Sequence, residues 1–186
     1  GIVRYGLMVM IRKIRPGAMV EEAQDYAMVL ELAKKTQYDL FILDVSMPNG
    51  SFLNAYTLLK KYSPHCKILI FSSLDEEVYA MRYIESGADG WGNKLATDQE
   101  MHTALEKIFN NGKYVSDAVK DSLVFYKSGK GKSRQLDHLS NREIAIANML
   151  VSGKSLKEIS QELHLHVSTV STYKTRIFEK LQIQNL

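Results

Sequence analysis

The sequence predicts an α/β protein with a doubly wound parallel sheet, followed by a small all-α helix-turn-helix domain. Up to about residue 115, short apolar runs that end at turn signals alternate with helical patterns, which is typical of parallel βαβ units. Beyond residue 134 no strand pattern remains, and three helical patterns follow. Residues 127–134 contain no apolar side chain and predict a flexible basic linker between two domains.

Charge is distributed unevenly along the 186 residues, whose net charge is +3. Residues 1–126 carry 14 basic and 16 acidic side chains, whereas residues 127–186 carry 10 and 5. The basic tail is therefore the part expected to contact a polyanion. The single cysteine, Cys66, excludes an internal disulfide and a cysteine-based zinc site. No run is long enough to span a membrane and no leader pattern is present, so we expect a cytoplasmic protein without membrane contact.

The first elements alternate between helical and extended patterns. Residues 3–14 form an amphipathic pattern that Pro16-Gly17 ends, and residues 18–23 predict a short strand. Asp25 is a typical N-cap for a helix over 26–35. The apolar face of that helix consists of Tyr26, Val29, Leu30 and Ala33.

The apolar run 40–43 predicts a buried strand that delivers Asp44 to the carboxyl edge of the sheet, before the turn Pro48-Asn49-Gly50. Ligands bind at this edge in open parallel sheets, so Asp44 is a candidate for chemistry; the alternative is an acid that caps the next helix. The alternation continues with strands over 67–71 and 90–93 and with helices over 51–62, 75–86, 97–110 and 117–126.

Three more side chains are expected at the same edge as Asp44. Ser72 ends the second strand, Trp91 lies in the last strand, and Lys94 follows that strand. Each has a structural alternative, because Ser72 could cap a helix, Trp91 could pack in the core, and Lys94 could be a solvated loop residue. Their joint placement favours the functional interpretation.

The segments Asp44-Val45-Ser46-Met47-Pro48, Phe71-Ser72, and Gly87-Ala88-Asp89-Gly90-Trp91 followed by Lys94 resemble the receiver domains of two-component response regulators. The resemblance implies a flavodoxin-like fold over residues 1–115 and phosphorylation of Asp44. It further implies that Lys94 is the fixed cation, that Ser72 binds the phosphoryl group, and that Trp91 stands at the position of a rotating tyrosine or phenylalanine. Asp44 and the backbone carbonyl of Ser46 would be ligands of Mg²⁺.

Receiver domains begin with an apolar strand that ends in a magnesium-binding acidic pair, whereas this sequence starts inside the first helix. That strand would lie in the middle of the sheet, whose ladder hydrogen bonds it would complete. We therefore expect the natural protein to be longer at its N-terminus; a strand donated by a partner chain is the alternative.

The tail predicts helices over 140–151, 155–163 and 168–181, of which the last two form a helix-turn-helix. The apolar residues expected to hold these two helices together are Ile159, Leu163, Leu165, Val167, Val170 and Ile177. The polar residues expected to reach DNA phosphates or base edges are Ser171, Thr172, Lys174, Thr175 and Arg176. His164 and His166 are expected to be turn residues rather than metal ligands.

A second family resemblance rests on three segments of the tail. They are Leu139-Ser140-x-Arg142-Glu143, Gly153-Lys154-Ser155-x-Lys157-Glu158-Ile159, and Ser168-Thr169-Val170-Ser171-Thr172 followed by Lys180-Leu181. They resemble the NarL/LuxR class of DNA-binding domain, which adds Lys157, Ser168 and Thr169 to the DNA-binding residues. Ser171 and Tyr173 stand where the family usually has a basic residue and a histidine. The implied layout is a receiver over 1–115, a helix and linker over 116–138, and a DNA-binding domain over 139–186 whose fourth helix is missing.

The two resemblances together imply a DNA-binding transcriptional regulator that is switched by phosphorylation of Asp44 and is not a metabolic enzyme. Its partners would be DNA, a cognate histidine kinase and, in the active state, a second copy of itself. One alternative is a phosphorylation-independent (orphan) DNA-binding regulator with a degenerate receiver. An aspartate-dependent phosphatase is a weaker alternative, because Ser46 stands where such enzymes carry a second aspartate.

Overall fold

The protein is described here by a computed structural model that covers residues 1–121 and 139–183. The chain divides into two compact units, Gly1–Val124 and Phe125–Leu186. No helix in these described ranges is both long and apolar enough to cross a membrane.

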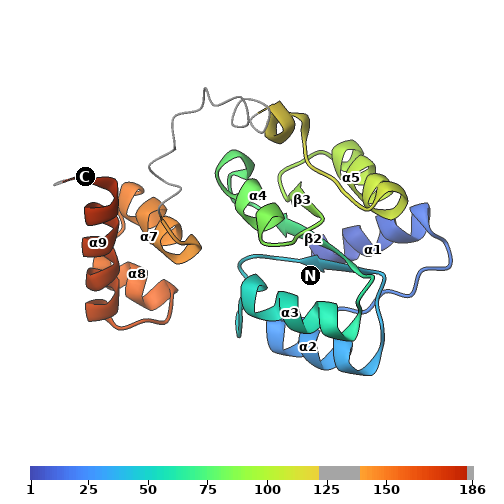
Figure 1. The fold of residues 1–186 in the computed structure, drawn as a ribbon, viewed down its shortest axis with the longest axis horizontal. Helices are drawn as coiled ribbons and strands as arrows, with labels where there is room; N and C mark the ends of the chain where they lie inside the picture. The colour runs from blue at the N-terminus through green and yellow to red at the C-terminus, as the bar shows by residue number, and fades with distance from the viewer. Residues whose placement is uncertain (122–138, 184–186) are drawn as a thin grey trace. The chain divides into compact units, whose positions relative to one another are not determined.

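The first unit is built from helices that alternate with the strands of one parallel sheet (Figure 1). Its main elements are α1 (Ile2–Ile14), α2 (Tyr26–Lys35), β1 (Leu40–Leu43), α3 (Phe52–Tyr62), β2 (Lys67–Ser72), α4 (Glu76–Glu85), β3 (Gly90–Asn93) and α5 (Asp98–Asn111). The strand order is β1-β2-β3, and both pairings are parallel. The predicted α/β fold with a parallel sheet is confirmed.

The register of the sheet brings the carboxyl ends of all three strands to one edge. Leu43 at the end of β1 lies opposite Ile70, and Ser72 at the end of β2 lies opposite Asn93 at the end of β3. The residues that follow β1 and β3 therefore emerge on the same side as Ser72.

Helices cover both faces of the sheet (Figure 1). On one face, α1 and α5 enclose a buried apolar cluster of Ile11, Leu69, Phe71, Met101, Leu105 and Ile108. Gly90 allows α5 to approach closely, because a Cβ there would lie 2.8 Å from Ile108 Cδ1. The Tyr83 ring of α4 lies 5.5 Å from that of Phe52 on α3 and 5.6 Å from that of Trp91 on β3. These aromatic contacts hold α3 and α4 together beside β3.

Helix starts follow the predicted capping residues. The Asp25 side chain accepts a hydrogen bond from the backbone N–H of Met28 at 2.7 Å, as expected of an N-cap. The expected reciprocal capping box is present between Thr97 and Glu100 at the start of α5. These caps could be predicted from the sequence because each involves residues only three positions apart.

The strand predicted over residues 18–23 is wrong, since these residues form neither helix nor strand. A strand needs a neighbour for its ladder hydrogen bonds. Within the described chain, β1 pairs only with β2, so residues 18–23 have no adjacent strand to join. Of the helix expected over 117–126, residues 117–121 are helical. The rest of it, the linker over 127–134 and the segment from residue 184 lie outside the described residues.

The second unit contains the three predicted helices, α7 (Asn141–Val151), α8 (Leu156–Glu162) and α9 (Val167–Leu181). Both α7 and α8 pack against α9. Ser140 and Glu143 form the predicted capping box at the start of α7. A second capping box, between Ser155 and Glu158, starts α8.

Candidate functional site

The carboxyl edge of the sheet brings together two side chains that lie 50 residues apart in the sequence. Asp44 directly follows β1, and Lys94 directly follows β3. The Lys94 ammonium donates to Oδ2 of Asp44 and forms an ion pair with it. The Lys94 backbone N–H donates to the carbonyl of Ser72 at 2.9 Å, so the lysine is held next to the end of β2. The predicted convergence of Asp44, Ser72 and Lys94 is present.

The Asp44 carboxylate is fixed from two sides. Its Oδ1 accepts a hydrogen bond from the Ser46 backbone N–H at 2.9 Å, while Oδ2 accepts from Lys94. The side chains of Asp44 and Lys94 are 28% and 26% exposed, so a molecule from solvent can reach the pair. A carboxylate that is oriented, accessible and next to a fixed cation is suited to nucleophilic attack on an anionic group.

Ser72 and Trp91 are both fully buried. Ser72 is the last residue of β2, whereas Trp91, which was also expected at this edge, lies inside β3 opposite Ile70. The Ser72 hydroxyl oxygen accepts a hydrogen bond from the Leu74 backbone N–H at 3.2 Å, which gives it a local structural contact. Trp91 packs against Tyr83, and its indole Nε1 has no hydrogen-bond partner within the part of the chain that the structure describes. Trp91 also lines a small cavity together with Glu76, Tyr114 and Ser116.

The predicted magnesium ligands are the Asp44 carboxylate and the carbonyl of Ser46, which lie in the same turn after β1. Oxygen donors of this kind suit Mg²⁺, which is commonly bound by one or two carboxylates and otherwise keeps its waters. Within residues 1–121 and 139–183, no group of three or more His, Cys, Asp or Glu side chains is placed to hold a metal ion. The described residues thus fit a magnesium ion that binds through few protein ligands.

Tyr26 is a residue at this site that the sequence did not reveal. Its hydroxyl donates to the backbone carbonyl of Asp44 at 3.2 Å. In the sequence, Tyr26 belongs to the apolar face of α2, and this pattern gives no signal that its hydroxyl reaches a residue 18 positions away.

The helix-turn-helix of the second unit is held by a small apolar core. Ile159 of α8 and Val170 and Ile177 of α9 are buried, as predicted. Leu163 and Leu165 are half-buried in the turn. Val167 was also expected in this core, but that prediction is wrong, because its side chain is 47% exposed. As the first residue of α9 it lies at the free end of the helix, one turn before the buried Val170.

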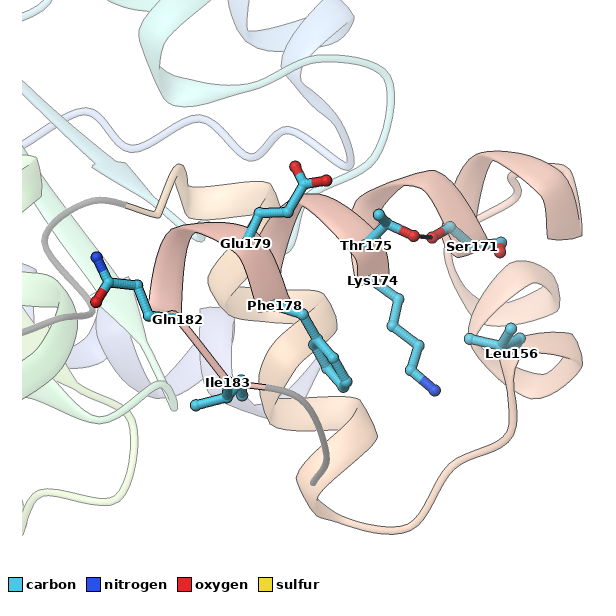
Figure 2. A pocket seen from close by; sticks show the side chains of 8 residues that line it. All are labelled: Leu156, Ser171, Lys174, Thr175, Phe178, Glu179, Gln182 and Ile183. Carbon is cyan, nitrogen blue, oxygen red and sulfur yellow. Dashed lines mark hydrogen bonds between the residues drawn. The ribbon is translucent and has the colours of Figure 1, made fainter.

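The candidate DNA-binding residues lie mainly on the open surface of α8 and α9. The exposed members are Lys157, Ser168, Ser171, Thr172, Thr175 and Arg176, and the half-buried members are Thr169 and Lys174. Lys174 lies beside a groove, with its ammonium 5.2 Å from the centre of the Phe178 ring (Figure 2). Leu156 faces them from the start of α8, so this side of α9 is partly apolar.

Two hydroxyls of this face are engaged with the helix itself. Thr172 donates to the carbonyl of Ser168 at 3.0 Å, and Thr175 donates to the carbonyl of Ser171 at 3.2 Å. Their oxygens keep acceptor capacity, whereas Arg176 supplies positive charge. Phosphate contacts are therefore expected chiefly from the basic side chains.

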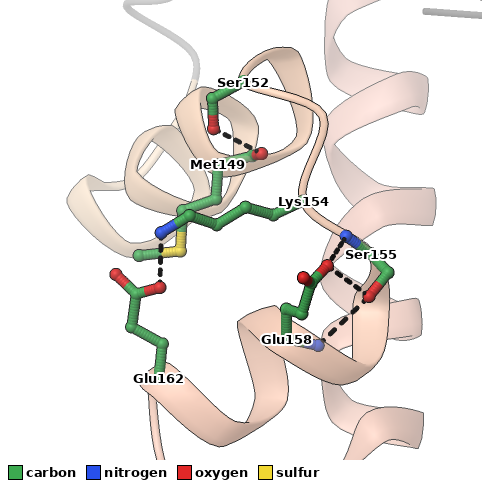
Figure 3. Close-up of polar contacts among 6 residues, drawn as sticks. All are labelled: Met149, Ser152, Lys154, Ser155, Glu158 and Glu162. Carbon is green, nitrogen blue, oxygen red and sulfur yellow. Dashed lines mark hydrogen bonds and ion pairs between the residues drawn. The ribbon is translucent and has the colours of Figure 1, made fainter.

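An ion pair joins the start of α7 to the end of α9. Glu143, at the start of α7 and almost fully buried, accepts a hydrogen bond from the Lys180 ammonium at 2.8 Å. Burial favours a raised pKa for Glu143, but the hydrogen bonds from Lys180 and Ser140 outweigh it and hold the pKa of this carboxyl below its usual value. A second ion pair, Lys154 with Glu162, bridges the turn before α8 to its last residue (Figure 3).

The fold and the two sites define a class of protein: a regulator with an α/β receiver domain and a helix-turn-helix domain. Residues 2–106 match the response regulator receiver domain family, and residues 137–186 match the family of bacterial regulatory proteins called the luxR family. The chain belongs to the response regulators that carry a LuxR-type DNA-binding domain, and it is a DNA-binding transcription regulator of that family.

Relatives agree with this assignment, and a solved structure shares the fold. Response regulator GacA of Pseudomonas aeruginosa is 33% identical over 98% of this chain and 86% of its own length. The Fimbriae Z protein of Escherichia coli K12 is 30% identical over 100% of this chain and 88% of its own. RcsB of Salmonella typhimurium, at 21% identity, shares the fold with a TM-score of 0.60 over 100% of this chain and 89% of that one.

Proposed function

We propose that Asp44 accepts a phosphoryl group and that this modification controls DNA binding by α9. The observation that carries the proposal is the ion pair between Asp44 and Lys94 at the accessible edge of the sheet. A phosphoryl group on Asp44 adds nearly two negative charges, so a nearby fixed cation lowers the barrier to its transfer.

The donor in this proposal is a phosphohistidine of a cognate histidine kinase. The bond between phosphorus and the donor nitrogen breaks as a bond from phosphorus to a carboxylate oxygen of Asp44 forms, and the released imidazole takes up a proton from water. Lys94 balances the charge of the transferred group. Mg²⁺, held by Asp44 and the Ser46 carbonyl, would supply further positive charge when bound.

Ser72 and Trp91 are the proposed switch residues. To bind a phosphoryl oxygen, the Ser72 hydroxyl would donate its own proton, and a turn of the side chain toward Asp44 would break the bond that its oxygen accepts from the Leu74 N–H. Such a movement would alter the packing of α4, which begins four residues after Ser72, and of Trp91 against Tyr83 on α4. The buried indole N–H, which has no hydrogen-bond partner among residues 1–121 and 139–183, supports an alternative position of Trp91, because a partner there would remove a desolvation cost.

The DNA-binding part of the proposal assigns contacts to α8 and α9. The residues concerned are Lys157, Ser168, Thr169, Ser171, Thr172, Lys174, Thr175 and Arg176. Solved structures of RcsB include complexes with promoter DNA in the presence of the phosphomimetic BeF3⁻, and RcsB dimers bound to DNA. By analogy, the phosphorylated protein would bind DNA as a homodimer in the cytoplasm, with half-sites about one helical turn apart.

The proposal is tested by the intact mass of the full encoded protein after incubation with acetyl phosphate and Mg²⁺. We expect one added phosphoryl group, with release of acetate, and no addition in Asp44→Asn. The matched control is Asp39→Asn, at the opposite end of β1, which should be labelled like the wild type. Labelling that persists in Asp44→Asn would overturn the assignment. No labelling of the wild type would favour the phosphorylation-independent regulator.

A further inference from the structure

The start of α2 contacts the loop that carries Asp44 at three points. The Tyr26 hydroxyl donates to the carbonyl of Asp44 at 3.2 Å, and the Tyr26 backbone N–H donates to the carbonyl of Pro48 at 3.1 Å. The Asn49 side-chain amide donates to Oδ2 of Asp25 at 2.7 Å. Two adjacent residues, the N-cap Asp25 and the first residue of α2, Tyr26, thus hold the loop at its beginning and near its end.

The loop also packs directly against the Tyr26 side chain, which is 1% exposed. At Gly50, which has φ +154°, an added Cβ would lie only 2.6 Å from Tyr26 Cβ. The neighbouring Asn49 has φ +58° in the left-handed region, which asparagine tolerates better than most residues. The sequence of the loop is therefore adapted to close contact with this tyrosine.

We infer that Asp25 and Tyr26 are positioning residues for the phosphoacceptor and that they fix loop 44–50 so that Asp44 faces Lys94. This inference rests on the proposed role of Asp44. The Asp44 carbonyl is held by Tyr26 and by the Met47 N–H at 3.3 Å, while its carboxylate is held by the Ser46 N–H. The hydroxyl of Tyr26 therefore restrains the same peptide unit that sets the direction of the carboxylate.

The chemistry of Tyr26 suits a permanent hydrogen-bond donor. Its burial, with smaller effects of Tyr83 and Asp44, raises the pKa of the phenol, so the hydroxyl keeps its proton throughout the physiological range. Tyr26→Phe retains the ring that packs under Gly50 and removes only this donor. The change therefore separates positioning from packing.

The test compares Tyr26→Phe with Tyr38→Phe in the full encoded protein. Tyr38 is a matched control, because its hydroxyl bonds to Glu21 and it lies before β1, away from the carboxyl edge. We expect Tyr26→Phe to slow labelling of Asp44 by acetyl phosphate about fivefold, as for the loss of one neutral hydrogen bond. Amide hydrogen exchange should accelerate in residues 44–50 and stay unchanged elsewhere in the sheet. Tyr38→Phe should change neither quantity.

A second variant, Asp25→Ser, tests the other contact without altering the core. Serine still caps α2, but its shorter side chain loses the bond to Asn49, so labelling should again slow and loop exchange again rise. If Tyr26→Phe does not fold, Asp25→Ser still tests whether these contacts position Asp44. Wild-type labelling and wild-type loop exchange in the folded variants would overturn the inference. If the wild type itself is not labelled, the proposed role of Asp44 fails, while the exchange data still report whether these residues hold the loop.

Discussion

Lys94 and Asp44 form an ion pair across the carboxyl edge of the sheet, although 50 residues separate them in the chain. The parallel order β1-β2-β3 creates this proximity, because it places the residues after β1 and β3 on the same edge. The pair is the most direct link between the fold and the proposed phosphorylation.

Replacing Lys94 tests the role of this cation. We expect Lys94→Gln to slow labelling of Asp44 by acetyl phosphate about 10- to 100-fold, because one charge-assisted hydrogen bond to the reacting group is lost. The matched control is Lys67→Gln, since Lys67 pairs with Asp89 at the opposite end of the strands and should leave the rate unchanged. Equal rates for Lys94→Gln and the wild type would show that this lysine has no part in the transfer.

The close approach of α5 to β3 predicts an unusually harmful glycine substitution. At Gly90 an added methyl group would lie 2.8 Å from both Ile108 Cδ1 and the Tyr114 carbonyl oxygen, so Gly90→Ala should destabilise the receiver by about 2 kcal/mol. Gly6 of α1 has nothing within 4 Å of such a methyl group, and Gly6→Ala should stabilise by about 1 kcal/mol.

Trp91 provides the measurement for both glycine variants. It is the only tryptophan in the sequence and is buried in the receiver, so its fluorescence follows unfolding of this unit in urea. A Gly90→Ala midpoint equal to that of the wild type would contradict the packing described between α5 and β3.

The contact between Glu143 and Lys180 predicts a pH-dependent stability of the second unit. Because the pKa of Glu143 is lower in the folded state, its stabilising effect is complete above the ordinary pKa of about 4.5 and is lost as the pH falls through the folded-state pKa. Glu143→Gln should lower stability by about 1 to 2 kcal/mol at pH 7. The difference between variant and wild type should shrink below about pH 4.

Circular dichroism melting checks this prediction. It follows the loss of helix in the second unit, which Trp91 fluorescence does not report. The control is Glu162→Gln, whose exposed ion pair with Lys154 should contribute less than about 0.5 kcal/mol. A difference in stability between Glu143→Gln and the wild type that grows as the pH falls would contradict this prediction.

Arg176 is expected to contribute to the electrostatic part of DNA binding. It is exposed on α9, so Arg176→Ala should weaken binding to all DNA sequences alike and reduce the salt dependence of log Kd by about 0.9. Fluorescence anisotropy at several salt concentrations measures both effects. Lys113→Ala, an exposed lysine in the first unit, is the control with an unchanged slope. An unchanged slope for Arg176→Ala would remove Arg176 from the phosphate contacts.

The sequence predicted those parts of the fold that local patterns encode. The apolar run before Asp44, the caps at Asp25 and Thr97, and the alternation of strands and helices each depend on residues close together in the chain. The strand over 18–23 was predicted wrongly, because a strand also depends on neighbours that its own residues do not specify.

The same distinction applies to the sites. The ends of the predicted strands were enough to place Asp44, Ser72 and Lys94 together, because the topology of a parallel sheet brings these strand ends to one edge. The contact of Tyr26 with the Asp44 carbonyl was not predictable, because a buried aromatic on an apolar helix face reads as packing. Val167 was assigned to the core for its apolar side chain, but its place at the first turn of α9 leaves it exposed.

The central claim is that phosphorylation of Asp44 controls DNA binding, and one titration tests it most directly. A DNA site enriched from a random pool by the acetyl phosphate-treated protein is titrated with treated and untreated wild type and with Asp44→Asn. We predict that treatment tightens the Kd of the wild type at least about fivefold, the lower end of typical coupling between two sites, and leaves Asp44→Asn unchanged. Equal Kd values for wild-type protein shown by mass to be phosphorylated and unphosphorylated would contradict the account.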